Sequence, residues 1–207
     1  LGFGKTHVED LAESLPENAR VGVAPDMLSL AAKRQLESAF AAKNISLVHS
    51  GDILAAIWEN RAALPQSPVY PHDAAFVSES AAAKLARVRA AMQEKGADYH
   101  LISSLDDTAW LTNLRGSDVP FNPVFLSYLL IGQNQATLFA APEALTSAAR
   151  AVLAEAGIGT AAYHEAAAAL SQIGGSLLID PAKTAVSTLA QLPDSVRLVE
   201  SINPSTL

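Results

Sequence analysis

Short apolar runs alternate along this chain with segments of helical period. Residues 20–25 give a brief apolar strand that stops at Pro25, and residues 28–43 carry an apolar stripe on one helical face. Residues 45–49 then alternate between apolar and polar side chains, as a second strand does. A strand followed by a helix and another strand is typical of a sheet flanked by helices, so the pattern predicts an α/β fold.

The rest of the chain continues this alternation. Residues 80–96 predict a helix that begins at Ser80 and ends at Gly96, and residues 99–103 predict a strand. The further predicted elements are a helical turn from 106 to 110, a hairpin at 124–131 and 136–140, helices at 143–156, 165–173 and 185–192, and strands at 177–180 and 196–199.

A proline-rich stretch divides the pattern in two. Residues 63–75 hold several prolines and few long apolar side chains, a composition that favours an extended, stiff connector. We therefore predict a first domain at residues 1–62, a linker at 63–75 and a second domain at 76–207.

A short internal similarity favours a repeat. Residues 20–25 and residues 176–181 are similar, and each is followed by a predicted helix and a strand that resemble one another. On this interpretation residues 1–62 are the C-terminal half of one domain copy, and residues 76–207 are a complete second copy.

Charge and composition exclude several classes of partner. The formal net charge of −7 and a pI near 5.1 oppose binding to a phosphate backbone, so no nucleic-acid partner is expected. No apolar run approaches the roughly 18 residues of a membrane span, so no membrane partner is expected either. The absence of cysteine and of a signal-peptide pattern favours a cytoplasmic location, and the N-terminus reads as a cut end within a longer chain.

Motifs for catalysis are missing from the sequence. Its five histidines are far apart, with no pair at zinc-binding spacing, and the sequence contains no nucleophile elbow and no phosphate-binding loop. We therefore expect no catalytic residue, no metal site and no cofactor within this chain.

The most informative stretch is the polar segment from Ser104 to Tyr128. It holds carboxylates, a tryptophan, an amide and an arginine within a loop between strands, where binding groups are often found. The residues alone also allow a purely structural interpretation. In that alternative Asp106 caps a helical turn, Trp110 belongs to the core, and Arg115 pairs with Asp118 at the surface.

This stretch resembles the second domain of long, three-domain Xaa-Pro aminopeptidases (aminopeptidase P). The family pattern is matched at Leu105–Asp107, Ala109–Leu111, Asn113–Asp118 and Asn122–Phe125. The resemblance implies a creatinase N-terminal-like α/β domain with a mixed central sheet flanked by helices, preceded by part of a similar domain.

The resemblance also implies where the chemistry of the parent protein lies. In that family a catalytic "pita-bread" domain follows, whose Asp, His and Glu side chains hold two divalent metal ions, often manganese. This chain ends about where the link to that domain is expected, so the catalytic domain is absent and the chain alone is predicted to be inactive.

The resemblance assigns seven residues to a substrate cleft or to an interdomain contact. They are Asp107, Trp110, Asn113, Arg115, Asp118, Asn122 and Phe125. Asp107 is expected to reach toward the metal domain, while Trp110 and Phe125 are expected to form an apolar wall for proline. For Arg115 and Asp118, a binding role and a local ion pair remain equal alternatives, and Phe121 and Tyr128 are expected to pack in the core or at the rim.

The resulting prediction is a hydrolase, specifically the non-catalytic part of a metalloprotease that releases the N-terminal residue before a proline. Its expected partners are Xaa-Pro peptides and its own C-terminal catalytic domain, with a homodimer as a further option. One alternative is a creatinase-fold binding or oligomerisation module with no peptidase attached. Another is a prolidase-like or creatinase-like parent, which is expected to lack the duplicated first domain.

Overall fold

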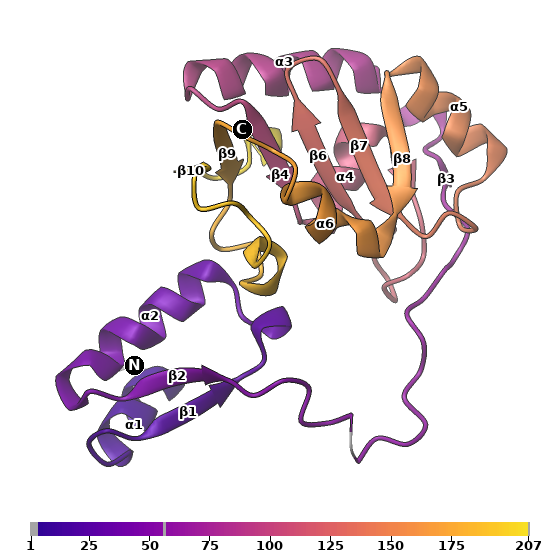
Figure 1. Ribbon diagram of the computed structural model, residues 1–207. Helices are drawn as coiled ribbons and strands as arrows, with labels where there is room; N and C mark the ends of the chain where they lie inside the picture. The colour runs from indigo at the N-terminus through magenta and orange to yellow at the C-terminus, as the bar shows by residue number, and fades with distance from the viewer. Residues whose placement is uncertain (1–3, 56, 207) are drawn as a thin grey trace. The chain divides into compact units, whose positions relative to one another are not determined.

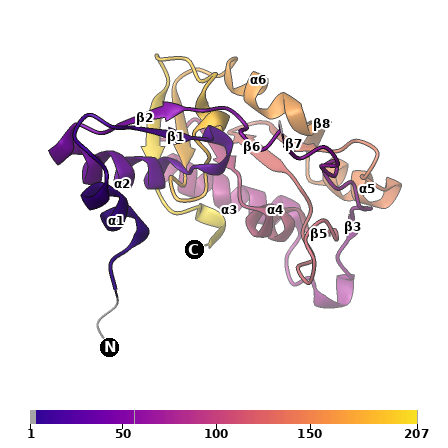
Figure 2. The same ribbon diagram turned by 90° about the horizontal axis from the view of Figure 1, so that it is seen from below.

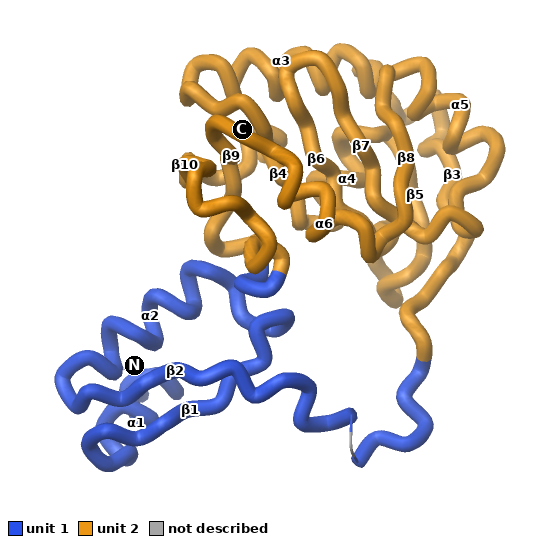
Figure 3. Tube along the Cα trace, viewed as in Figure 1, with its two compact units in different colours: residues 1–62, 185–187 blue, residues 63–184, 188–207 orange. Residues whose placement is uncertain are grey.

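The computed structural model describes residues 4–55 and 57–206, and the chain falls into two compact units (Figure 3). The first unit comprises residues 1–62 and 185–187, and the second comprises residues 63–184 and 188–207. Each unit contains its own parallel-stranded pairing, as the order of the strands shows.

The first unit is built on two parallel strands. Its elements are α1 (His7–Ser14), β1 (Arg20–Val23), α2 (Leu30–Phe40) and β2 (Ser46–His49) (Figure 1). The strands pair in parallel, with Val21 aligned to Leu47. The α2 helix begins at Ser29, whose hydroxyl accepts a hydrogen bond from the Ala32 N–H at 3.2 Å. The strand, helix and strand predicted between residues 20 and 49 are therefore confirmed.

This first unit has a small core. Among its described residues, the buried hydrophobic side chains are Val8, Phe40 and Ile45. The sequence also predicts a helix that Asp52 caps and that runs through Ile57 and Trp58. This prediction is wrong, because the described residues of the segment form turns; residue 56 lies outside the described part. Ile53 and Trp58 are exposed, so no packed surface favours a helix there.

The second unit is organised around a mixed six-stranded sheet. Its strands are β4 (Tyr99–Ile102), β6 (Tyr128–Gly132), β7 (Ala136–Ala140), β8 (Ile158–Ala162), β9 (Ser176–Ile179) and β10 (Arg197–Glu200), in the order β10-β9-β4-β6-β7-β8. The β6 strand is antiparallel to both of its neighbours, while the other pairs are parallel. The expected α/β fold with a mixed central sheet is confirmed.

Helices cover both faces of this sheet. The helices are α3 (Ala81–Glu94), α4 (Leu105–Thr112), α5 (Ser147–Glu155) and α6 (Ala166–Leu170). The first three lie on one face and α6 lies on the other, as two perpendicular views show (Figures 1 and 2). The core between α3 and the sheet contains Leu85, Val88 and Met92, whose spacing in the sequence places them on one face of a helix.

Short strand pairings connect the proline-rich segment to the second unit. The β3 strand (Tyr70–Pro71) pairs antiparallel with β5 (Leu114–Arg115), and the Val69 N–H donates to the Ala144 carbonyl at 2.8 Å. The sequence did not predict β3, β5 or β8. The strands β3 and β5 are too short to show a period, and the small residues of β8 carry little strand preference.

Candidate functional site

The Asp107 carboxylate gathers hydrogen bonds at the first turn of α4. One oxygen accepts from the Ser104 hydroxyl and from Asn203 Nδ2 at 2.7 Å, and the other accepts from Ser205 Oγ at 2.9 Å and Thr206 Oγ1 at 3.2 Å. Burial favours the neutral acid, but the four hydrogen bonds together hold the pKa of Asp107 below its ordinary value. Asp107 is thus an ionised group that fastens residues 203–206 to α4.

Trp110 lies beneath two cations. Lys84 Nζ is 4.4 Å from the centroid of its indole ring, and the guanidinium carbon of Arg87 is 5.5 Å from it. Lys84 also donates to the Trp110 carbonyl at 2.8 Å, and Arg87 is held by two hydrogen bonds to Glu79. Burial lowers the pKa of Lys84. The indole ring therefore contacts charged groups, rather than presenting a purely apolar wall.

Asn113 ends α4 and joins it to α3. Its backbone has a φ of 56°, the left-handed conformation that asparagine tolerates at the end of a helix. Its side-chain oxygen accepts from Lys84 Nζ at 2.6 Å, and its side-chain nitrogen donates to the Glu79 carbonyl at 2.9 Å. These contacts give Asn113 a clear structural role within the second unit.

Asp118 braces the polar loop from the inside. Its Oδ1 accepts from the Ser67 N–H at 3.0 Å, and its Oδ2 accepts from the Leu126 N–H at 2.8 Å. Arg115 instead donates to the carbonyls of Ala109 and Leu114, each at 2.8 Å. Among the described residues no ion pair joins Arg115 to Asp118, so the structural alternative that paired them is wrong. Both side chains instead form hydrogen bonds with backbone groups.

Phe121 stands at the tip of this loop and is fully exposed. Its φ is 64°, a conformation that is unfavourable for a side chain other than glycine, asparagine or aspartate. A bridge between Val119 and Asn122 closes the turn, and Asn122 Nδ2 donates to Asp106 Oδ1 at 3.3 Å. Phe121 was expected to pack in the core or at the rim, and its full exposure excludes the core. The signal for an exposed turn was the proline on either side of the Phe121–Asn122 pair.

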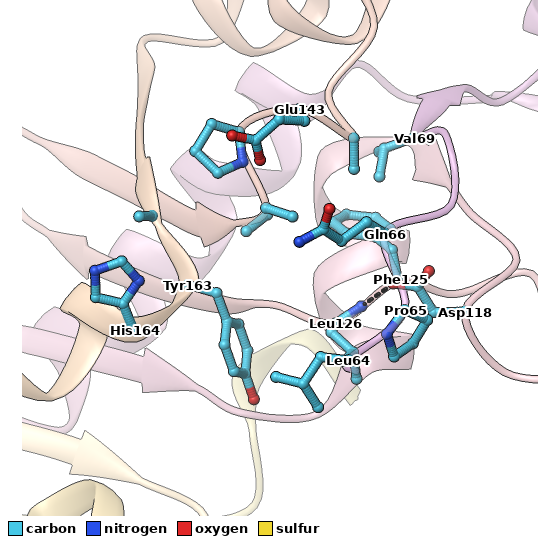
Figure 4. A pocket seen from close by; sticks show the side chains of 15 residues that line it. Leu64, Pro65, Gln66, Val69, Asp118, Phe125, Leu126, Glu143, Tyr163 and His164 are labelled. Carbon is cyan, nitrogen blue, oxygen red and sulfur yellow. Dashed lines mark hydrogen bonds between the residues drawn. The ribbon is translucent and has the colours of Figure 1, made fainter. Parts of the chain in front are cut away.

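A cavity of about 370 Å³ opens beside the same loop. It is lined by Leu64, Pro65, Gln66, Val69, Asp118, Phe125, Leu126, Ala140, Ala141, Pro142, Glu143, Ala144, Ala162, Tyr163 and His164 (Figure 4). Two of the predicted site residues, Asp118 and Phe125, thus share one cavity wall, and Phe125 is otherwise buried in the core. Asp107, Trp110, Arg115 and Asn122 do not line it.

The described residues also bear on metal and membrane binding. Within residues 4–55 and 57–206, no group of three or more His, Asp or Glu side chains could hold a metal ion. No helix in the same part of the chain is both long and apolar enough to cross a membrane.

Comparison with known proteins identifies similar sequences. Residues 60–207 match the family described as the creatinase/prolidase N-terminal domain. Aminopeptidase P2 of Arabidopsis thaliana is 32% identical over 191 residues, which cover 89% of this chain and 27% of that protein. The Xaa-Pro aminopeptidase ApepP of Drosophila melanogaster is 34% identical over 131 residues, covering 62% of this chain and 21% of that protein. The chain therefore spans about a quarter of the length of these curated relatives.

One solved structure has the same fold over nearly the entire chain. The X-prolyl aminopeptidase of Caenorhabditis elegans, described as a cytosolic enzyme with a di-nuclear active site, superposes with a TM-score of 0.87 and 21% identity. The match covers 99% of this chain and 35% of that one.

Proposed function

Because this chain belongs to the creatinase/prolidase N-terminal domain family, we propose that it is the non-catalytic N-terminal region of a metal-dependent Xaa-Pro aminopeptidase. In this proposal the whole enzyme cleaves the peptide bond between an N-terminal residue and the proline that follows. The catalytic domain of the whole enzyme would hold two divalent metal ions, expected to be manganese, which would supply an activated water there. The chain described here orients the substrate and restricts access to the cleft.

The observation that carries this proposal is the rigid loop that displays Phe121. Asp118 ties the loop to Ser67 and Leu126, and Gly116 allows close contact, since a Cβ there would lie 2.7 Å from the Phe125 Cβ. A braced loop that exposes an aromatic side chain in an unfavourable conformation has the properties of a recognition surface rather than of a folding element.

Asp107 has a revised role in this proposal. Its carboxylate is saturated by Ser104 and by residues 203–206, so it acts as a positioning residue and not as a direct ligand of the substrate. The matched part is about a quarter of the Arabidopsis thaliana relative, and in this proposal Asp107 fixes the direction in which the chain runs on from residues 203–206. Asp107 thereby orients the catalytic domain without contacting its metal ions.

The domain organisation and the location belong to the same proposal. Residues 1–62 form the C-terminal half of a first creatinase-like domain, residues 63–75 form the connector, and residues 76–207 form a second such domain. The fold similarity of both units to one X-prolyl aminopeptidase supports this division. The description of that relative as cytosolic supports a cytoplasmic location.

The purified chain provides the first test. We expect it neither to bind manganese stoichiometrically nor to cleave a proline-containing peptide such as Leu-Pro-Pro, because residues 4–55 and 57–206 supply no group of side chains that could hold the metal. Peptide cleavage is measured by the release of free leucine, with and without manganese. Turnover that persists in the presence of a chelator would contradict the proposal.

The longer protein tests the role of Asp107. We expect Asp107→Ala to lower kcat/KM by about tenfold or more, since a misplaced domain loses alignment at the reacting bond. Asp106→Ala, which removes a neighbouring exposed carboxylate with one long hydrogen bond, is the matched control and should leave kcat/KM within about twofold. If Asp107→Ala lowers the melting temperature enough for unfolding to account for the lost activity, a purely structural role would be favoured.

A further inference from the structure

The cavity beside the polar loop is built from segments far apart in sequence. One wall is the extended segment Leu64–Gln66, a second is formed by Phe125 and Leu126, and the others come from the ends of β7 and β8. Figure 4 shows the Gln66 amide extending toward the middle of the space that Glu143, Tyr163 and Leu64 surround in this view. A volume of about 370 Å³ is sufficient for a small organic molecule or the end of a peptide.

The charged groups of this cavity are of one sign. Asp118 and Glu143 both line it, and none of its lining residues, all of which are described, is a lysine or an arginine. Asp118 accepts two backbone hydrogen bonds, but a carboxylate has about four acceptor positions, so capacity remains. Within the described part of the chain, the Glu143 carboxylate has no hydrogen-bond or ion-pair partner.

The remaining surface is mainly apolar. Leu64, Leu126 and the ring of Phe125 line the cavity together with several alanines. The aromatic ring of Tyr163 lies on the side opposite Phe125 and stacks on Tyr128 at a centroid distance of 5.2 Å, which fixes its position. Apolar walls with two carboxylates select a ligand that combines an apolar body with a positive charge.

We propose that this cavity binds an apolar group bearing a primary ammonium, and in particular the N-terminal end of a short apolar peptide. The ammonium lies beside Glu143, while the apolar body contacts Phe125, Leu126 and Tyr163. The site belongs to this chain alone, so the proposal depends on the proposed function only in the choice of a proline-containing probe.

Titration of the purified chain with leucyl-prolinamide tests the proposal. Amide chemical shifts are followed by NMR, and we expect saturable changes at Gln66, Leu126 and Ala141 with a Kd on the order of 1 mM. N-acetyl-leucyl-prolinamide, which lacks the ammonium, should bind about fivefold more weakly or worse. Hexylamine, an apolar amine that is not a peptide, distinguishes the two classes of ligand. Binding as tight as that of leucyl-prolinamide would support apolar amines in general, and weaker binding would support a peptide.

Two variants and a control locate the site. Glu143→Gln should weaken leucyl-prolinamide binding about three- to fivefold, and Ala162→Leu should abolish it by filling the cavity. Glu94→Gln removes the same charge from an exposed position on α3 that does not line the cavity, and it should leave the Kd unchanged. Equal binding of the acetylated probe, no effect of Ala162→Leu in a folded variant, or no saturable shift up to about 20 mM would overturn the proposal.

This test is separate from that of the proposed function. Binding is measured on the isolated chain without catalysis, whereas the proposed function is tested by peptide cleavage in the longer protein. If the isolated chain binds the peptide but the longer protein has no peptidase activity, the binding-site proposal is supported and the proposed function is contradicted. If the longer protein cleaves the peptide but the isolated chain does not bind it, the proposed function is supported and the binding-site proposal is contradicted.

Discussion

Phe121 combines two unfavourable properties in one residue. Its backbone lies in the left-handed region at a φ of 64°, and its aromatic ring is fully exposed to solvent. The left-handed backbone costs about 1 kcal/mol or more of folding free energy. Because the ring is exposed, no hydrophobic burial offsets this cost. A comparison of small residues at this position isolates the backbone term.

We expect Phe121→Gly to be more stable than Phe121→Ala by about 0.5–1 kcal/mol, because only glycine adopts positive φ without strain. Both variants lose the ring, so their difference reports the backbone alone. Urea unfolding provides the free energies, and the same pair of substitutions at the exposed helical residue Glu94 should give the opposite order. A less stable glycine variant at position 121 would show that the left-handed turn is not maintained in solution.

His100 is a buried histidine whose pKa lies well below its ordinary value. Its ring is fully buried, its Nδ1–H donates to the Leu178 carbonyl at 2.9 Å, and its Nε2 has no hydrogen-bond partner. Burial lowers the pKa of His100 from 6.5 to about 4, although the Leu178 carbonyl and the charges of Asp107 and Asp180 act in the opposite direction.

The stability of the second unit should therefore rise with pH between about 4 and 6.5. In this window the unfolded chain binds a proton at His100 that the folded chain does not bind, so protonation favours unfolding. The full effect is up to about 3 kcal/mol, and it is measured by urea unfolding at a series of pH values. His100→Gln, which does not titrate, should flatten this slope. The contribution of Asp107, whose folded pKa is lowered, is lost at more acidic pH, below about 4, and should persist in the variant.

At the scale of elements, Lys84 links two helices. From α3 its ammonium donates to the Trp110 carbonyl and to the Asn113 side chain at the end of α4. The Lys84 side chain is only 7% exposed, and it is the donor to the Asn113 side-chain oxygen, so its loss leaves that oxygen without this hydrogen bond.

We expect Lys84→Met to destabilise the protein by about 1–3 kcal/mol, although methionine preserves much of the apolar stem. Arg87→Met removes an exposed cation from the same helix and the same indole ring, and it should cost at most about 1 kcal/mol. Thermal or urea unfolding of the two variants measures the difference. Equal losses would mean that contact with the Trp110 ring, and not the hydrogen bonds to α4, determines the effect.

The sequence predicted elements with a strong period and missed those that depend on a partner. The α3 helix and β4 follow from the apolar face at Leu85 and Val88 and from the run after Tyr99. The β8 strand, whose residues are mostly small, is a strand because β7 supplies its hydrogen bonds. The same distinction applies to the candidate site, where the sequence predicts local features but not contacts between distant residues. The polar loop was recognised by its composition, but residues 203–206 bind Asp107 from nearly a hundred positions away, and local patterns do not encode such a contact.

At the scale of the whole molecule, the two units differ in how much core they hold. The large hydrophobic cluster lies entirely within the second unit, whereas the buried hydrophobic side chains described in the first are Val8, Phe40 and Ile45. Stability against opening depends on such buried apolar contacts.

We expect backbone amides of β1 and β2 to exchange with deuterium at least about tenfold faster than those of β4, β6 and β7. Mass spectrometry of peptic fragments resolves the units, and a chain starting at residue 63 provides a second measurement. That shorter chain should retain the slow exchange of the six-stranded sheet, because its core needs no residue of the first unit. Loss of protection in the shorter chain would show that the units fold as one.

The pairing of β1 with β2 has a consequence for the aggregation of this protein. In the described part of the chain these strands form a sheet of two, so each has one outer side whose amides and carbonyls are free of a neighbouring strand. Unpaired strand edges of this kind can form hydrogen bonds with strands of other molecules. At high concentration the protein should therefore aggregate first through the unpaired edges of β1 and β2. A lysine introduced on the outer edge of either strand should slow this aggregation.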